Sequence, residues 1–103
     1  MSFVKALPDN EIRPGNAVSV ELEGRVIALV RTTDGRLFAV DDSCSHEEAS
    51  LSEGFVEEAV IECPRHGATF DLETGKALSL PAINAIGTYE VRVENGEILV
   101  NIT

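Results

Sequence analysis

The sequence predicts an all-β fold, and two observations carry most of this prediction. Apolar and polar residues alternate in several short runs, and Asp-Gly and Asn-Gly pairs stand between such runs. Alternation with a period of two is typical of a strand that buries one face, and these dipeptides favour the tight turns of β-hairpins. Helix signals are few by comparison. We therefore expect short strands joined by turns.

Three strands are expected in the first half of the chain. The stretch AVSVELEG, residues 17–24, alternates so that three apolar side chains share one face: Val18, Val20 and Leu22. The run RVIALVR, residues 25–31, is continuously apolar in its middle, which predicts a more buried strand. The pair Asp34-Gly35 then predicts a hairpin turn into a returning strand, LFAV, at residues 37–40.

The C-terminal part of the chain predicts a second hairpin. Three apolar or aromatic positions alternate with charged ones before the turn: Tyr89, Val91 and Val93. Asn95-Gly96 is expected to make the turn, and three apolar residues alternate after it: Ile98, Val100 and Ile102. Helix is expected only in short pieces. PDNEI, residues 8–12, predicts a single turn capped by Asp9, and SHEEASLSEG, residues 45–54, ends at Gly54.

Length and charge limit the functions that fit. A chain of 103 residues without a linker, repeat or low-complexity tract predicts one domain, residues 1–103. The net charge of −10 disfavours nucleic acid and anionic membranes, and it suits a basic protein partner unless it only keeps the chain in solution. The sequence shows no signal peptide and no apolar run that could span a bilayer, so we expect a cytoplasmic protein with reduced thiols.

All cysteines and histidines of the chain fall in two short motifs. Cys44-x-His46 is followed, after an interval of 16 residues, by Cys63-x-x-His66. Each motif comes directly after a predicted strand, on loops at about 43–50 and 62–69, so both are expected at loop tips. A structural zinc could accept two thiolates and two imidazoles. One cysteine and one histidine from each loop suits a two-iron cluster better, because each iron can then take one kind of ligand from both loops.

With these motifs the chain resembles a Rieske-type [2Fe-2S] ferredoxin of the soluble, bacterial, oxygenase-associated kind. The resemblance covers CSHEEASLSEG, IECPRHGATFDLETGKALSLP and the strands around them. It implies three small antiparallel sheets with two cluster-binding loops at one tip. It also implies a third, covering loop at about 79–86, around Pro81. One [2Fe-2S] cluster would be held by four ligands, the two cysteines on one iron and the two histidines on the other: Cys44, Cys63, His46 and His66.

Residues beside the second motif indicate a low reduction potential. High-potential members of the resembled family carry a serine and a tyrosine after the second histidine, whereas this chain has Ala68 and Phe70, which donate no hydroxyl hydrogen bond to cluster sulfur. They also carry a disulfide between the loops, for which this chain has no cysteines. Gly67 either makes a plain turn or lets backbone N–H groups approach a sulfide. Arg65, a cation between two ligands, either tunes the cluster or contacts a partner.

The resemblance implies an electron carrier with no catalytic residues of its own. It would take one electron at a time from a flavin-containing reductase and pass it to a terminal aromatic-ring oxygenase. The sequence contains no fingerprint for flavin, nicotinamide or phosphate binding. Two alternatives remain at this point. One is a small Rieske subunit of another redox enzyme such as nitrite reductase, and the other is a zinc-stabilised interaction module.

Overall fold

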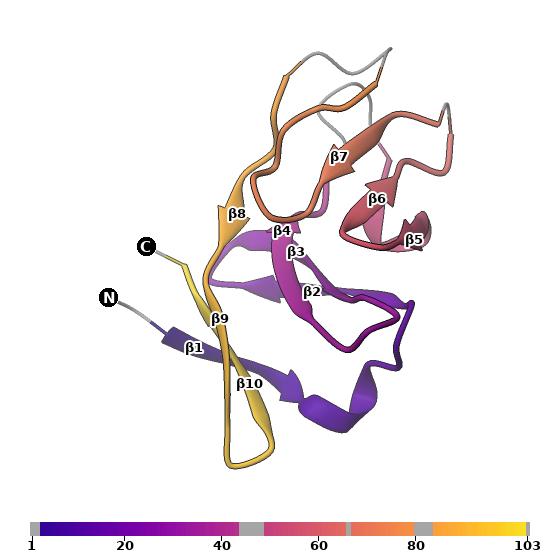
Figure 1. Ribbon diagram of the computed structural model, residues 1–103. Coiled ribbons are helices and arrows are strands. Elements are labelled where there is room, and N and C mark those ends of the chain that lie inside the picture. Colours follow the sequence, from indigo (N-terminus) through magenta and orange to yellow (C-terminus); the bar gives the residue numbers. More distant parts are fainter. Residues whose placement is uncertain (1–2, 44–48, 66, 80–83, 103) are drawn as a thin grey trace.

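A computed structural model describes residues 3–43, 49–65, 67–79 and 84–102, and strands dominate this part of the chain (Figure 1). The strands form three antiparallel sheets. The first contains β1 (Phe3–Pro8), β10 (Glu97–Asn101) and β9 (Val91–Glu94), in that order. The second contains β2 (Ala17–Leu22), β3 (Arg25–Arg31), β4 (Leu37–Asp41) and β8 (Thr88–Tyr89). The third contains β5 (Phe55–Glu57), β6 (Val60–Glu62) and β7 (Thr69–Asp71). The expected all-β fold of three small sheets is confirmed.

Strand β3 lies between two apolar cores, which explains its continuous apolar run. Ala28 and Val30 belong to a core shared with the third sheet, and Ile27 and Leu29 belong to a core shared with the first sheet. All four side chains are fully buried. Because successive side chains of a strand point to opposite faces, an element covered on both sides needs apolar residues throughout. The second sheet is therefore the middle layer of the molecule.

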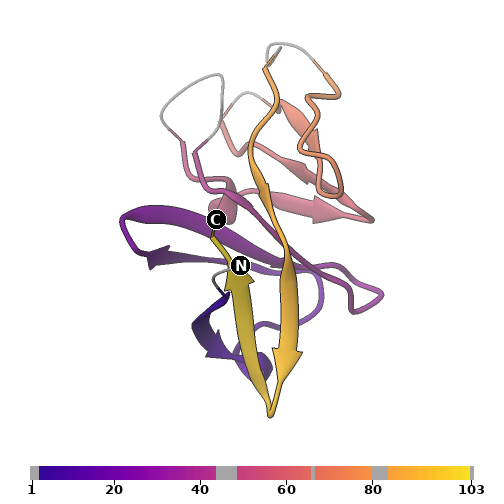
Figure 2. The same ribbon diagram turned by 90° about the vertical axis from the view of Figure 1, so that its left-hand side faces the viewer.

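The predicted C-terminal hairpin is present, but its first strand starts later than expected. Asn95 and Gly96 both have positive φ, 53° and 78°, as the expected two-residue turn requires. Tyr89 instead ends β8 and pairs with Ala39 of the second sheet, and the chain crosses to the first sheet at Glu90 (Figure 2). The expected run through Tyr89, Val91 and Val93 is thus wrong as a single strand, because its two parts belong to different sheets.

The two helical pieces are single 3-10 turns, η1 (Asp9–Glu11) and η2 (Leu51–Glu53). The predicted cap by Asp9 is wrong, since Pro8 occupies the position before η1 and no side chain caps the turn. The carboxylate and carbonyl of Asp9 instead accept hydrogen bonds from the guanidinium of Arg31, which also donates to the carbonyl of Ile12 at 2.8 Å. Within the described ranges, no helix is long and apolar enough to cross a membrane.

Candidate metal centre

The second motif begins at the end of β6 and its loop returns into β7. In this hairpin Ile61 pairs with Phe70, and Glu62 pairs with Thr69. The backbone N–H of Cys63 donates to the carbonyl of Ala68 at 2.7 Å, which closes the loop at its base. Cys63 is thereby held at the first position of the loop, where the sequence predicted a ligand.

Gly67 closes the same loop from within. Its N–H donates to the carbonyl of Cys63 at 3.2 Å, and its φ of +76° lies in the left-handed region that favours glycine. Gly67 therefore makes a turn, and the closer approach of backbone N–H groups to a sulfide stays a prediction. Pro64 and Arg65, the described residues between Cys63 and Gly67, lie in a turn.

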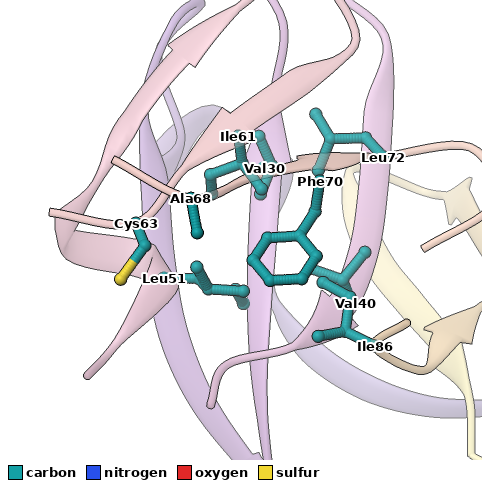
Figure 3. Close-up of a cluster of buried hydrophobic side chains, with 10 residues drawn as sticks. Val30, Val40, Leu51, Ile61, Cys63, Ala68, Phe70, Leu72 and Ile86 are labelled. Atoms are coloured by element: carbon teal, nitrogen blue, oxygen red, sulfur yellow. The ribbon is translucent and has the colours of Figure 1, made fainter. Parts of the chain in front are cut away.

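Cys63 is the predicted ligand whose surroundings the structure describes. Its side chain is fully buried, forms no disulfide, and lies at one end of an apolar core beside Leu51 and Ala68 (Figure 3). A buried free thiol at the start of a closed loop fits a thiolate ligand, since metal binding removes its proton. Cys44, His46 and His66 lie outside the described residues. In the part of the chain that is described, no group of three or more potential metal ligands occurs.

The first motif is held at its base by Asp42, which the sequence alone did not mark as functional. Asp42 is buried, its carbonyl accepts the N–H of Leu51 at 2.7 Å, and its Oδ1 accepts the N–H of Ser52 at 2.8 Å. Ser43 and Ser50 form an isolated β-bridge just beyond. These bonds bring the two ends of the first loop together. The signal in the sequence was an acidic pair, Asp41-Asp42, separated from Cys44 by one residue, Ser43.

A close backbone approach places the two motif segments side by side. Gly54, which follows η2, lies so near β6 that a Cβ at this position would stand 1.9 Å from the carbonyl oxygen of Glu62. Leu51, from the return of the first loop, is buried in the same core as Cys63. The described bases of the two motif loops therefore belong to one continuous piece of structure. Figure 1 shows this part of the molecule around β5, β6 and β7.

The described ends of the third loop are attached to both motif segments. On one side, Leu78 donates its N–H to the carbonyl of Thr69 at 2.8 Å, and the hydroxyl groups of Thr69 and Ser79 lie 2.8 Å apart. On the other side, the N–H of Gly87 donates to Oδ2 of Asp41 at 2.8 Å. Pro81 lies outside the described residues. The attachment points agree with a loop that starts and ends beside the two motifs.

Asp41 and Tyr89 make a second unpredicted contact next to the site. The phenol of Tyr89 donates to Oδ1 of Asp41 at 2.5 Å, and the guanidinium of Arg25 lies 5.9 Å from the centre of the ring. Burial and the neighbouring carboxylate of Asp41 raise the pKa of Tyr89 above its ordinary value of 10.0. The phenol thus stays protonated and acts as a donor across the ordinary pH range.

Ala68 and Phe70 are both fully buried in the apolar core that contains Cys63, and Ala68 is the nearer of the two to the thiol (Figure 3). The side chain of Thr69, between them in sequence, is bonded to Ser79. Neither Ala68 nor Phe70 carries a hydroxyl group, so neither side chain can donate a hydrogen bond to a sulfur atom. The low potential stays a prediction.

Comparisons with known proteins establish the family. Residues 2–90 match the model of the Rieske [2Fe-2S] domain. The 3-phenylpropionate/cinnamic acid dioxygenase ferredoxin subunit of Escherichia coli K12 is 43% identical over 103 residues, covering 99% of this chain and 95% of the relative. The chain therefore belongs to the Rieske [2Fe-2S] domain family. Its relatives within that family include ferredoxin subunits of dioxygenases.

Solved structures agree with this assignment. The ferredoxin of carbazole 1,9a-dioxygenase from Nocardioides aromaticivorans IC177 superposes with a TM-score of 0.90 at 32% identity, over 97% of both chains. A chain from the complex of reduced oxygenase and oxidized ferredoxin in carbazole 1,9a-dioxygenase has a TM-score of 0.87 at 37% identity, over 95% of this chain and 91% of that one. Both are Rieske-type neighbours of nearly the same length.

Proposed function

We propose that this protein is the ferredoxin component of a multicomponent oxygenase. It carries one electron at a time from a flavin-containing reductase to a terminal aromatic-ring oxygenase, and it has no catalytic residues of its own. The observation that carries the proposal is the match to a dioxygenase ferredoxin subunit over almost the whole of both chains. This chain also contains all four residues of the two proposed metal-binding motifs.

We propose one [2Fe-2S] cluster held by four ligands: Cys44 and Cys63 on one iron, His46 and His66 on the other. Neutral imidazoles in place of two thiolates leave the cluster less negative, which makes it easier to reduce. Support comes from the described bases of the loops, since Asp42 closes the first and the bond from Cys63 to Ala68 closes the second. The covering loop is placed at about 79–86, around Pro81. The cluster supplies the electron-accepting chemistry, and this chain holds and shields it.

The whole chain, residues 1–103, is proposed to be a single Rieske domain. Strand β3 supports this proposal, because its alternating side chains join the core under the third sheet to the core under the first. We place the protein in the cytoplasm, where free thiols persist. Its net charge of −10 suits basic protein partners and disfavours nucleic acid and anionic membranes.

Electron paramagnetic resonance of the dithionite-reduced protein, with metal analysis, tests the proposal. We expect a rhombic signal whose average g lies below the free-electron value, as mixed cysteine and histidine ligation produces. Iron and acid-labile sulfide should be present in equal amounts. A silent, colourless sample that contains stoichiometric zinc would overturn the proposed cluster and favour the interaction module instead.

Electron delivery needs a separate test with purified reductase and oxygenase. The reduced protein should be reoxidised rapidly when oxygenase, its substrate and oxygen are present. The rate of reduction by the reductase should fall as ionic strength rises, because salt screens the attraction between an acidic carrier and a basic partner. A carrier that shows the cluster signal but is not oxidised by any oxygenase partner would contradict the function while leaving the cluster intact.

A further inference from the structure

The third sheet has one face on the core and one face open to solvent. Its inner side chains pack on the core that contains Cys63: Val56, Ile61, Phe70 and Ala77. Residues directly opposite each other in an antiparallel pair share a face, and successive residues alternate. The opposite side, which we call the outer face, consists of eight residues: Phe55, Glu57, Val60, Glu62, Thr69, Asp71, Lys76 and Leu78.

One row of the outer face runs beside the second cluster loop. Phe55 pairs with Glu62, and Glu62 pairs with Thr69. Leu78 continues the row, because its N–H donates to the carbonyl of Thr69 next to the bridge between Phe70 and Ala77. Glu62 directly precedes Cys63, so this is the row of the sheet nearest to the loop that carries the second motif.

Large apolar side chains stand at both ends of this row. Phe55 is 65% exposed and Leu78 is 49% exposed, although each belongs to an ordered, hydrogen-bonded part of the sheet. An aromatic side chain left in water beside a functional loop is a common feature of protein contact surfaces, where aromatic residues provide much of the binding energy. Phe55 is the more exposed of the two, so it is the side chain that would bury the larger apolar area in a contact with a partner.

The rest of the outer face is predominantly acidic. Its eight residues include one cation, Lys76, and three carboxylates: Glu57, Glu62 and Asp71. The exposed Glu58 in the adjoining turn adds a further negative charge. A second copy of this chain would bring the same negative charge against itself, so self-association through this face is disfavoured. The complementary surface is basic, with a small apolar recess for Phe55.

We propose that the outer face is the docking surface for a terminal oxygenase, with Phe55 as its apolar anchor and Glu57 as part of its acidic attraction. The proposal rests on the proposed function as an electron carrier. A small face is sufficient, because electron-transfer complexes are transient and bury little area. Electron transfer slows steeply with distance, and docking beside Glu62 brings the partner next to the Cys63 loop. A ferredoxin of similar structure has been solved in complex with its oxygenase.

Two pairs of matched variants test the proposal in the cluster-containing protein. Phe55→Ala removes the anchor, and Val93→Ala is its control, because Val93 is 46% exposed on a strand of the first sheet. Glu57→Lys reverses one charge of the outer face, and Glu21→Lys reverses an exposed charge on β2 of the second sheet. Binding to the purified cognate oxygenase is measured by calorimetry and by surface plasmon resonance. The midpoint potential and the resonance spectrum of every variant are recorded as well.

We expect Phe55→Ala to weaken binding about tenfold or more, with unchanged potential and spectrum. Glu57→Lys should lower the association rate several-fold and flatten its dependence on salt. The two control variants should bind within about twofold of the unchanged protein. Equal affinity in Phe55→Ala and Val93→Ala overturns the proposal, and so does weakened binding to the reductase alone. Failure of the unchanged protein to show the cluster signal or to reduce the oxygenase would instead contradict the proposed function.

Discussion

The phenol of Tyr89 donates a hydrogen bond of 2.5 Å to Oδ1 of Asp41, and the two residues are 48 positions apart in the chain. The other carboxylate oxygen of Asp41 accepts the N–H of Gly87 at 2.8 Å. Asp41 is the last residue of β4, just before the loop of the first motif. One carboxylate therefore ties the C-terminal end of the third loop to the strand that leads into the loop of the first motif.

Removing the phenol should weaken this connection. Tyr89→Phe keeps the ring and deletes one hydrogen bond to a carboxylate, so we expect the free energy of unfolding to fall by about 1–2 kcal/mol. Urea titration followed by circular dichroism measures this difference. Asp41 keeps its bond from Gly87, so the fold should persist. If Tyr89→Phe has the same free energy of unfolding as the unchanged protein, the hydrogen bond from Tyr89 to Asp41 makes no net contribution to stability.

The raised pKa of Tyr89 also predicts a dependence of stability on pH. The folded protein holds the phenol proton more tightly than the unfolded chain, whose pKa is the ordinary 10.0. This stabilisation is therefore complete below that pH and is lost as pH rises through the folded pKa. Because the chain contains one tyrosine, the ultraviolet absorbance of tyrosinate reports this residue alone. The pH at which half of the tyrosine is ionised should be higher in the folded protein than in the chain unfolded by urea. In Tyr89→Phe the free energy of unfolding should not show this additional decrease at alkaline pH. If the decrease persists in that variant, groups other than Tyr89 cause it.

Gly75 and Gly24 offer a matched pair for the attachment of the third loop. Both have positive φ, 77° and 85°, so alanine introduces a similar backbone strain at each. At Gly75 the added Cβ would also stand 2.0 Å from the carbonyl oxygen of Ile86, whereas nothing lies within 4 Å at Gly24. We expect Gly75→Ala to lower the free energy of unfolding by about 1–3 kcal/mol more than Gly24→Ala. Thermal and urea unfolding measure the two losses. Equal losses in Gly75→Ala and Gly24→Ala would mean that residues 84–86 move to accommodate the added Cβ at little energetic cost.

A hydroxyl group beside Cys63 should raise the reduction potential. Ala68→Ser adds a donor at a buried position next to the proposed ligand, and a hydrogen bond to sulfur stabilises the reduced, more negative cluster. A stabilisation of about 1.4 kcal/mol corresponds to about 60 mV for one electron. Ala77→Ser, at the other side of the same core, should leave the potential unchanged. Redox titration of both variants measures the difference, and equal potentials would show that position 68 does not face the cluster.

Exchanging a proposed histidine ligand for cysteine should act in the opposite direction. In His46→Cys or His66→Cys a thiolate replaces a neutral imidazole, which adds negative charge and lowers the potential. We expect a downward shift of at least about 100 mV, with a resonance signal closer to that of a four-cysteine cluster. The measurement is a redox titration of whichever variant assembles a cluster. A cluster with unchanged potential and signal would show that the exchanged histidine is not a ligand.

Some parts of the fold are encoded by neighbouring residues and were therefore predicted. The turn at Asn95-Gly96 needs two positive φ angles, which this dipeptide adopts readily, and the structure has both. The hairpin at Asp34-Gly35 was predicted from its turn residues, of which Gly35 has positive φ, and the buried strand β3 was predicted from its continuous apolar run. The two motifs also predicted the Rieske family, which the comparisons show. Local backbone preference and residue chemistry suffice for features of this kind.

Other features depend on contacts between distant parts of the chain. The short strands β1, β5 and β7 have little alternation of their own, and β1 forms because β10 pairs with it from the other end of the chain. Asp9 was predicted to cap a helix, but its carboxylate accepts a hydrogen bond from Arg31, which is 22 positions away in the chain. Burial of Asp42 and the bond from Tyr89 to Asp41 have no periodic signal in the sequence.

Residue types and spacings of a few positions are enough to encode the strands, the turns and the chemistry of the proposed ligands. Tertiary structure alone decided which strands share a sheet, where the chain crosses at Glu90, and that Phe55 and Leu78 stand in one row beside Cys63. The physical reason is that hydrogen bonds between strands and burial in a shared core form between segments far apart in the chain. Their partners are therefore set by how the whole chain packs.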